Sequence, residues 1–476
     1  MSAHDQLTAL DATFLELEQS DDSALMHIGG ALIFESLPGC GAPALAQLRH
    51  HLDERLERLP RYRQRLDTPR ASGLSWPSWV DDEHFDVAAH VRHATLPAPG
   101  DECELLEWIS DFYSHRLDRA RPLWEIVLVD GMADGRWALA WKTHHCLVDG
   151  VGSVGVVDLL LDAEPAPYVP PGPGGDTELA VAAAERTRHV RLLHAPELAR
   201  QTAGVSLAAA RMGAHTVAHP REAFERSRGV IELLVRDELI AAPQCSLNQP
   251  IGATRRIDAV HVTLEELNAI RGVLGGTIND VVLCVVTAGL RELLLARGEE
   301  PPRQGLRAMV PVNIRRDAER GDLGNRVSSL FVDLPVAEAD PMRRYGRVRA
   351  AVHRQKASGQ ALAGAALTAL VGLAPPVLHA TFARSLFAKR LFNVTITNVP
   401  ASPRRLYAFG APMIDVVPMV PLAAEHALGV AVVSYAGAMT FGLCADRATV
   451  PDLDVFKDGI VTALRELAPA DLTAAR

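Results

Sequence analysis

Residues 142–150 read KTHHCLVDG and bring two histidines, a carboxylate and a glycine into one short segment. His144 and His145 are adjacent, and Asp149 and Gly150 follow closely. Histidine titrates about 9 pH units below the hydroxyl that it would activate. A histidine base must therefore take the proton while the oxygen attacks, within hydrogen-bond reach. The segment is a candidate for general-base catalysis.

Three other kinds of site compete with this interpretation. A metal site needs three or four converging ligands, and no matching second cluster lies nearby in the sequence. Residues 150–155, GVGSVG, fit a dinucleotide-binding pattern, but PAPYVPPGPGG at 165–175 stands where that fold needs its next buried strand. Ser153 lacks the first glycine of the G-x-S-x-G nucleophile motif. The general base is the hypothesis that survives.

The position of the motif restricts its geometry. Adjacent residues at a strand end point to opposite sides, so only one of His144 and His145 can face a given cavity. We expect the other ring to pack or to support the backbone. Asp149 could orient the base directly or stabilise the loop through an arginine elsewhere, and across a turn the second role is geometrically easier. We interpret Cys146 as a packing residue rather than a nucleophile.

The elements around the motif alternate between strands and helices. Residues 122–131 and 135–145 predict two strands joined by a tight turn, with the histidines at the end of the second. Residues 153–163 predict a helix with Ser153 as its N-cap. Residues 43–59 have helical periodicity.

The length of the chain and a Pro- and Gly-rich break predict two α/β halves. A chain of 476 residues exceeds one ordinary core. A Pro- and Gly-rich break at 164–176 precedes an Ala-, Arg- and Glu-rich stretch that predicts connecting helices. We therefore divide the chain into an N-terminal unit over 1–165, a helical linker over 166–240 and a C-terminal unit over 241–476.

Composition narrows the class of protein. Hydrophobic residues make up 48% and charged residues 22%, which is typical of a packed soluble protein. A net charge of -10 argues against a nucleic-acid partner. Six cysteines without a CxxC pair, and an N-terminal segment without a secretory pattern, predict a reducing, cytoplasmic location.

One apolar stretch raises the question of a membrane. Residues 361–383 carry no Asp, Glu, Lys or Arg, but Pro375 and Pro376 interrupt them, which favours a buried or interfacial helix pair over a membrane span. The basic residues in ARSLFAKR, at 383–390, could hold the chain on an anionic membrane surface. The alternative, a solvated helix face, is slightly preferred.

The motifs together resemble the bacterial wax ester synthase/acyl-CoA:diacylglycerol acyltransferase family, in the wider group of chloramphenicol acetyltransferase and peptide condensation domains. HHCLVDG is similar to the HHxxxDG signature of that family. The likeness covers nearly the whole chain and is weakest over the linker, about 166–240. It also rests on LTALDATFLELE, LPRYRQRL, FDVAAHVRHATLPAPG, RPLWEIVLVDG, GGTINDVVL, VPVNIR, ITNVPASPRRLYAFGA and VVSYAGAMTFGLCADR.

The resemblance implies an α/β fold with two chloramphenicol acetyltransferase-like subdomains, each a mixed sheet with flanking helices, joined by a helical crossover linker. The active site would lie between them, at a tunnel open on opposite faces. By the motif, His145 is the general base, His144 accompanies it, Asp149 is structural and Gly150 leaves room for substrate.

Further site residues follow from the same resemblance. The family's PLW element is associated with the acyl pocket and the wall of the site, and its ND motif could order the site or simply cap a helix. The asparagine is also a weak candidate for an oxyanion donor. An arginine after the VPVN strand could pair with Asp149, or could be a surface residue at a strand end. In this chain these residues are Pro122, Leu123 and Trp124, then Asn279 and Asp280, then Arg315.

The implied reaction is direct transfer of a long acyl chain from acyl-CoA to diacylglycerol, which forms triacylglycerol through a ternary complex without an acyl-enzyme. Fatty alcohols, giving wax esters, are the alternative acceptors. A condensation-type enzyme and a non-catalytic lipid-binding homologue remain as other classes. No metal or cofactor is required besides acyl-CoA as substrate. Peripheral contact with the inner membrane or lipid inclusions is a further expectation, and the oligomeric state is not determined by the sequence.

Overall fold

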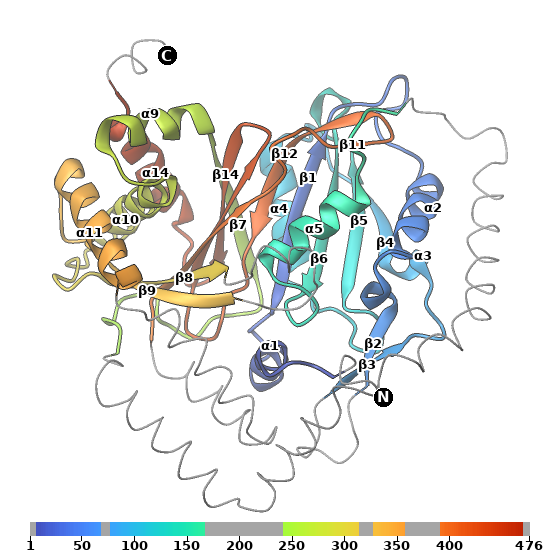
Figure 1. The fold of residues 1–476 in the computed structure, drawn as a ribbon, viewed down its shortest axis with the longest axis horizontal. Helices are drawn as coiled ribbons and strands as arrows, with labels where there is room; N and C mark the ends of the chain where they lie inside the picture. The colour runs from blue at the N-terminus through green and yellow to red at the C-terminus, as the bar shows by residue number, and fades with distance from the viewer. Residues whose placement is uncertain (1–5, 68–76, 167–240, 314–326, 358–390, 470–476) are drawn as a thin grey trace, which may run out of the picture.

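The computed structural model describes residues 6–67, 77–166, 241–313, 327–357 and 391–469 (Figure 1). The linker predicted over 166–240 lies almost wholly outside these residues. The apolar stretch at 361–383, the basic residues at 384–390 and Arg315 lie outside them as well. Within the described residues the strands form two six-stranded sheets and one two-stranded sheet, with helices packed around them.

The first sheet carries the histidine motif. Its strand order is β11-β12-β1-β6-β5-β4, and β6 pairs antiparallel with both of its neighbours. The two strands predicted on either side of the turn are confirmed as β5 and β6, since backbone hydrogen bonds pair them directly. The bounds are Tyr407–Ala408 for β11, Ala411–Met419 for β12, His27–Phe34 for β1, Trp137–His144 for β6, Trp124–Asp130 for β5 and Val91–Thr95 for β4.

Both faces of this sheet are covered, so its strands bury side chains on both sides. Along β5, Ile126 and Leu128 join one apolar cluster, while Val127 and Val129 join the other. The first cluster lies under α2 and α5, and the second lies under α4. The helices of this part are α1 over Ala9–Ser20, α2 over Leu45–Leu56, α3 over Val87–His90, α4 over Glu102–Tyr113 and α5 over Gly150–Leu160, with short turns at Pro60–Arg63 and Ala133–Gly135.

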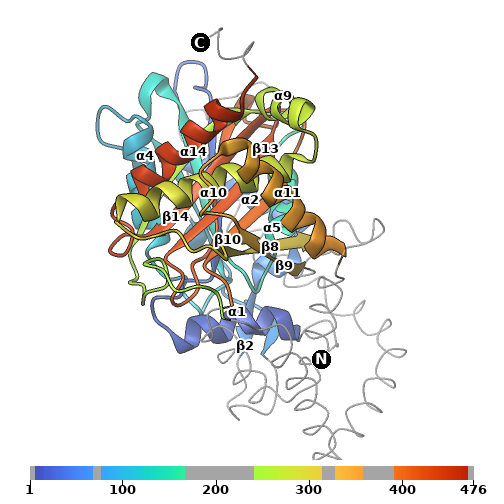
Figure 2. The same cartoon turned by 90° about the vertical axis from the view of Figure 1, so that its left-hand side faces the viewer.

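The second sheet has the order β7-β14-β13-β10-β8-β9, with β10 parallel to both of its neighbours. Figure 2 shows α10, α11 and α14 as a layer over one face of this sheet. The strands are β7 over Arg255–Thr263, β8 over Leu306–Asn313, β9 over Val327–Leu334, β10 over Val394–Pro400, β13 over Leu428–Tyr435 and β14 over Ala438–Asp446. The helices are α9 over Leu264–Leu274, α10 over Ile278–Ala296, α11 over Pro341–Ala357 and α14 over Leu453–Leu467. The small sheet pairs β2, Gln64–Asp67, with β3, Ser78–Asp81.

A strand from late in the sequence joins the two sheets. β12 pairs antiparallel with β1 in the first sheet and packs against β13 and β14 of the second. The backbones of β12 and β14 lie close together, since a Cβ atom on Gly442 of β14 would lie 1.8 Å from the carbonyl oxygen of Pro418 in β12. The sheets therefore do not follow the order of the chain, and the predicted boundaries at residues 165 and 241 stay a prediction.

The helix after the motif begins earlier than predicted. Asp149, not Ser153, is the N-cap of α5, and its Oδ1 accepts a hydrogen bond of 2.7 Å from the Gly152 N–H. Ser153 lies inside the first turn and its hydroxyl donates to the Gly150 carbonyl. The prediction of Ser153 as the cap was wrong because a carboxylate four residues earlier is an equally good acceptor and stands at the point where the strand-to-helix turn ends.

None of the described helices is by itself both long and apolar enough to cross a membrane. The pair α9 and α10 passes that test of length and composition only when taken together, with a bend of 96° between the two helices.

Candidate active site

The two histidines at the end of β6 have different surroundings. His144 is buried, with 1% of its surface exposed, whereas His145 is only partly covered. The His145 ring stacks on Phe14 of α1, with ring centroids 3.9 Å apart and planes within 9°. Its backbone N–H donates a 2.8 Å hydrogen bond to the Met26 carbonyl. The two rings thus differ, with His144 packed inside and His145 partly open; the prediction that only one of them faces the substrate cavity stays a prediction.

His144 supports the turn that follows. Its Nδ1 accepts a 3.1 Å hydrogen bond from the backbone N–H of Cys146. Its Nε2 lies 3.4 Å from Oε2 of Glu18. Because Nδ1 is an acceptor, the neutral ring must carry its proton on Nε2, directed at the carboxylate.

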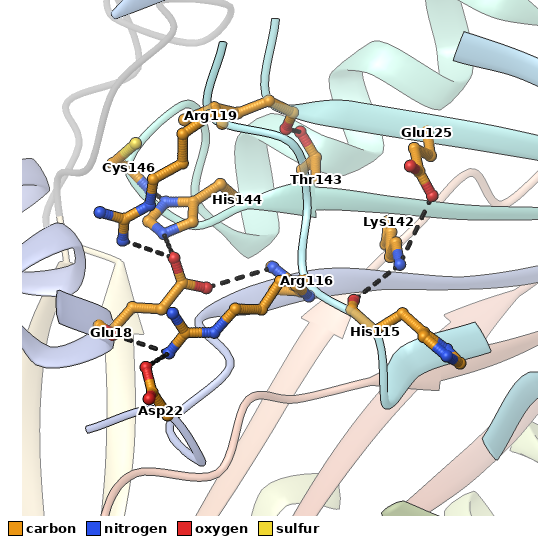
Figure 3. A network of polar contacts seen from close by, with 12 residues as sticks. Glu18, Asp22, His115, Arg116, Arg119, Glu125, Lys142, Thr143, His144 and Cys146 are labelled. Atoms are coloured by element: carbon orange, nitrogen blue, oxygen red, sulfur yellow. Dashed lines mark hydrogen bonds and ion pairs between the residues drawn. The ribbon is translucent and has the colours of Figure 1, made fainter. Parts of the chain in front are cut away.

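Glu18 is the centre of a buried polar cluster (Figure 3). Its carboxylate accepts a 2.6 Å hydrogen bond from Arg119 and lies 3.3 Å from Nε2 of His27. Burial alone would raise the pKa of Glu18, but the contacts with His144 and His27 outweigh burial and hold the pKa below its ordinary range. Burial lowers the pKa of His27 to about 4, although Glu18 opposes that change. At neutral pH the cluster therefore contains an ionised Glu18 and a neutral His27.

Asp149 and Gly150 begin α5 directly after the loop. Asp149 is fully buried and caps the helix, so its structural role in the loop is visible in the geometry. A Cβ on Gly150 would lie 3.2 Å from Cγ2 of Val399 in β10. The loop of the first sheet thus touches a strand of the second sheet at this glycine. Arg315, the predicted partner of Asp149, lies outside the described residues.

The PLW residues lie next to the motif. Pro122, Leu123 and Trp124 are buried at the start of β5, beside the end of β6. The Leu123 carbonyl accepts a 2.9 Å hydrogen bond from the His144 N–H. The Trp124 ring stacks on His90, with centroids 4.5 Å apart. The structure therefore places this element beside His144, and its role in the acyl pocket stays a prediction.

A buried lysine of β6, Lys142, connects this strand to the end of α4. Lys142 donates from Nζ to the carbonyls of Phe112 and His115, at 2.9 and 2.8 Å, at the end of α4. It also lies 3.4 Å from the Glu125 carboxylate. Burial lowers the pKa of Lys142, and Glu125 opposes that change. A cation at a helix C-terminus is favourable, so Lys142 ties the strand that ends in the histidines to α4.

The ND residues are explained by helix capping. Asp280 is the third residue of α10, and its carboxylate accepts from the Thr277 N–H and hydroxyl at 2.7 and 2.8 Å. Of the two alternatives for this motif, the geometry therefore shows helix capping for Asp280. Asn279 lies beside it and is partly exposed, and its side chain makes no hydrogen bond within the described part of the chain. Its role as an oxyanion donor stays a prediction.

An apolar cavity of about 30 Å³ lies between α2, α5 and the first sheet. Leu48 and Leu52 of α2, Val156 and Leu160 of α5 and Phe409 beside β11 are among its lining residues. A volume of this size holds roughly one small group. It is an apolar space behind the motif helix and is too small, as it stands, for a long acyl chain.

Sequence reasoning missed the residues of α1. Phe14 and Glu18 contact His145 and His144, whereas the sequence places them only within the family-like segment LTALDATFLELE. Their spacing of four residues places them on one face of a helix, and this spacing was the signal available. Cys146 is buried, and burial raises the pKa of its thiol well above the ordinary value, which agrees with a packing role.

Comparison with known proteins decides the family. The model of the wax ester synthase/diacylglycerol acyltransferase catalytic domain matches residues 7–282, and that of the C-terminal domain of the same family matches residues 323–468. The chain belongs to this family. It is accordingly an acyltransferase, and the resemblance predicted from the motifs is confirmed.

Relatives extend over the full length of this acyltransferase. It is 33% identical to the Mycobacterium tuberculosis protein named "Probable diacyglycerol O-acyltransferase tgs1", over 97% of this chain and 95% of the relative. It is 30% identical to "Probable diacyglycerol O-acyltransferase tgs2" of the same organism, over 97% and 98%. A solved structure, the wax ester synthase/diacylglycerol acyltransferase of Marinobacter aquaeolei VT8, is 29% identical with a TM-score of 0.70, over 99% and 100% of the two chains.

The fold is shared more widely than the sequence. The first condensation domain of the CDA synthetase is similar with a TM-score of 0.57 at 18% identity, over 98% of this acyltransferase and 97% of that chain. At this identity the likeness concerns the fold alone. The predicted α/β fold of the chloramphenicol acetyltransferase and condensation-domain group is confirmed.

Proposed function

We propose that this acyltransferase moves a long acyl chain from acyl-CoA to the free hydroxyl of diacylglycerol, with His145 as the general base. The observation that carries the proposal is the position of His145, which directly follows a buried strand, stacks on Phe14 and is partly open, in a chain that belongs to an acyltransferase family. A base held in one orientation at a partly open site is what proton transfer during attack requires.

The proposed chemistry needs only a bound donor, an acceptor and this ring. Nε2 of His145 takes the hydroxyl proton as the acceptor oxygen bonds to the thioester carbonyl carbon. The carbon–sulfur bond then breaks, and the imidazolium returns the proton to the leaving thiolate. Free CoA and an ester are the products, so the atoms balance without an acyl-enzyme. The tetrahedral intermediate needs donors to its oxyanion, and Asn279 is the candidate for that role.

Diacylglycerol is the proposed acceptor because the relatives at 33% and 30% identity carry that substrate in their names. A fatty alcohol is the second candidate, since the name of the Marinobacter structure also includes wax ester synthase. Both acceptors partition into lipid. We therefore propose a cytoplasmic protein that works peripherally at the inner membrane or at lipid inclusions.

The experiment supplies purified protein with palmitoyl-CoA and either dioleoylglycerol or hexadecanol, and follows free thiol and the lipid product. Wild type should form triacylglycerol, and His145→Ala should lose about 10²- to 10⁴-fold in kcat. His93→Ala, which removes an exposed histidine on β4 of the same sheet, should keep full activity. Dialysis against EDTA should leave the rate unchanged, because the proposal uses no metal.

Each other outcome contradicts part of the proposal. Thiol release by His145→Ala equal to that of wild type would remove His145 as the base. Product from hexadecanol alone would replace diacylglycerol by a fatty alcohol. Lipid binding without product from either acceptor would favour a non-catalytic lipid-binding protein.

A further inference from the structure

Helix α1 contacts both histidines of the motif from one face. Phe14 and Glu18 are four residues apart, so their side chains lie one helical turn apart on the same side. Phe14 stacks on His145, and the Glu18 carboxylate lies beside His144. A segment more than a hundred residues earlier in the chain therefore faces the two residues on which the proposed chemistry depends.

The contact with Phe14 acts on the ring of His145. The two ring planes are nearly parallel, at 9°, and the centroids are 3.9 Å apart. Rotation of the imidazole out of this plane would break the stack. The backbone of His145 is held separately, through its N–H and the Met26 carbonyl. With the backbone anchored, Phe14 restricts the remaining freedom of the ring, which is the direction in which Nε2 points.

The contact with Glu18 acts on the backbone beside His145. The Glu18 carboxylate lies 3.4 Å from Nε2 of His144 and favours a proton on that nitrogen, which leaves Nδ1 of His144 as the acceptor for the Cys146 N–H. If the proton moved to Nδ1, two N–H groups would face each other and the Cys146 hydrogen bond would be lost. Glu18 thus selects the tautomer of His144 that holds the turn directly after His145.

Glu18 is itself held in place. Arg119 donates to Oε2 at 2.6 Å, and Arg116 donates to the Glu18 carbonyl at 2.9 Å (Figure 3). Only 3% of the Glu18 side chain is exposed, although it is charged. The polar groups around its carboxylate are His27 of β1, His144 of β6 and Arg119 of the segment after α4. A buried carboxylate that accepts from Arg119 and contacts two histidines from two other parts of the fold can move little.

We propose that α1 is the positioning element of the active site: Phe14 sets the ring plane of His145, and Glu18, through His144, sets the turn that carries it. This inference rests on the proposed role of His145 as the base. Neither Phe14 nor Glu18 touches the reacting atoms, so both are positioning residues.

The variants remove one contact each. Phe14→Leu keeps an apolar side chain without an aromatic plane, whereas Phe14→Tyr keeps the plane. Glu18→Gln keeps the volume but has one acceptor oxygen in place of two, so it cannot serve both histidines and Arg119. Leu15→Ala is the matched control, because Leu15 is a buried residue of α1 that packs in the apolar core.

Kinetics separate positioning from folding. Phe14→Leu and Glu18→Gln should lower kcat about 10-fold with KM changed less than about 2-fold, because a misplaced base slows the chemical step and not binding. Phe14→Tyr should recover most of kcat. Leu15→Ala should lower the melting temperature and leave kcat per folded molecule unchanged. A change in KM alone, a Phe14→Tyr variant as slow as Phe14→Leu, or a loss of kcat in Leu15→Ala equal to that in Phe14→Leu would overturn the proposal.

A spectroscopic measurement tests the arrangement without catalysis. Long-range ¹H–¹⁵N correlation spectra of histidine-labelled protein should show His144 as the Nε2–H tautomer, and Glu18→Gln should mix the two tautomers. Ring-current shifts on His145 should be large in wild type and in Phe14→Tyr, and small in Phe14→Leu. Inactive wild type with these spectra would contradict only the proposed function. Spectra that do not respond to either variant would contradict the role of α1.

Discussion

His261 is expected to stay protonated far above neutral pH because two carboxylates lie against its ring. Nε2 lies 2.6 Å from Glu102 of α4, and Nδ1 lies 2.8 Å from Asp415 of β12. Thr440 of β14 donates to the same aspartate at 2.8 Å. The contacts with Asp415 and Glu102 outweigh burial and raise the pKa of His261 to about 10. The ring therefore links α4, which packs on the first sheet, to β7 of the second sheet.

Solvent exposure limits how much the two ion pairs of His261 contribute to the free energy of unfolding. In a site sealed from water, a rise in pKa from 6.5 to about 10 would correspond to about 5 kcal/mol. The side chains of His261 and Glu102 are 37% and 50% exposed, however, and Asp415 is 25% exposed. Ion pairs in such places contribute about 1 kcal/mol or less each, so we expect about 1–2 kcal/mol for the two together.

The direction of the pKa change of His261 determines how its contribution to stability varies with pH. Because folding raises the pKa, the stabilisation is complete below about pH 6.5. It declines as the pH rises and is lost above about pH 10, the pKa in the folded chain. His261→Gln should therefore melt about 1–2 °C below wild type at pH 6, since the entropy of unfolding of a long chain makes each kcal/mol a small shift. The two proteins should melt together at pH 11.

The assay combines thermal denaturation at several pH values with an NMR titration of the His261 ring. The ring should not titrate between pH 5 and 8.5, and Asp415→Asn should bring its pKa down toward neutral pH. A ring that titrates near pH 6.5, or a difference between wild type and His261→Gln that persists at pH 11, would refute the reasoning.

Two further predictions concern the supports of the motif. Asp149→Ala should cost about 0.5–2 kcal/mol of stability through the lost cap on the Gly152 N–H, while Asp149→Asn, which keeps an acceptor, should retain most of it; equal losses in urea denaturation would mean that the charge matters and not the cap. Lys142→Met should cost about 1–3 kcal/mol, because the carbonyls of Phe112 and His115 lose their buried donor, and a Lys142→Met protein that melts with wild type would contradict that role.

The local elements of the site could be predicted because they depend on near neighbours. Two strand-like segments at 122–131 and 135–145, joined by a tight turn, predicted β5 and β6, and β6 does end at His144. Alternation also predicted that the two rings would differ, as they do at His144 and His145. The prediction of Ser153 as the N-cap was wrong because two good capping residues lie four residues apart, and only the path of the turn distinguishes them.

The contacts between distant segments could not be predicted in this way. β12 pairs with β1 across almost four hundred residues of sequence, and no periodicity in either strand specifies its partner. The capping role of Asp280 was one of two alternatives until the carboxylate was seen to accept from Thr277.

The sequence by itself determined the family, the strand that leads into the motif and the histidine that is the candidate base, because these depend on residue types and on spacings of a few residues. Only the tertiary structure decided that α1 faces the motif, with Phe14 on His145 and Glu18 on His144. The physical reason is that periodicity states which face of an element is buried, whereas the partner of that face is chosen by packing and charge over the whole chain.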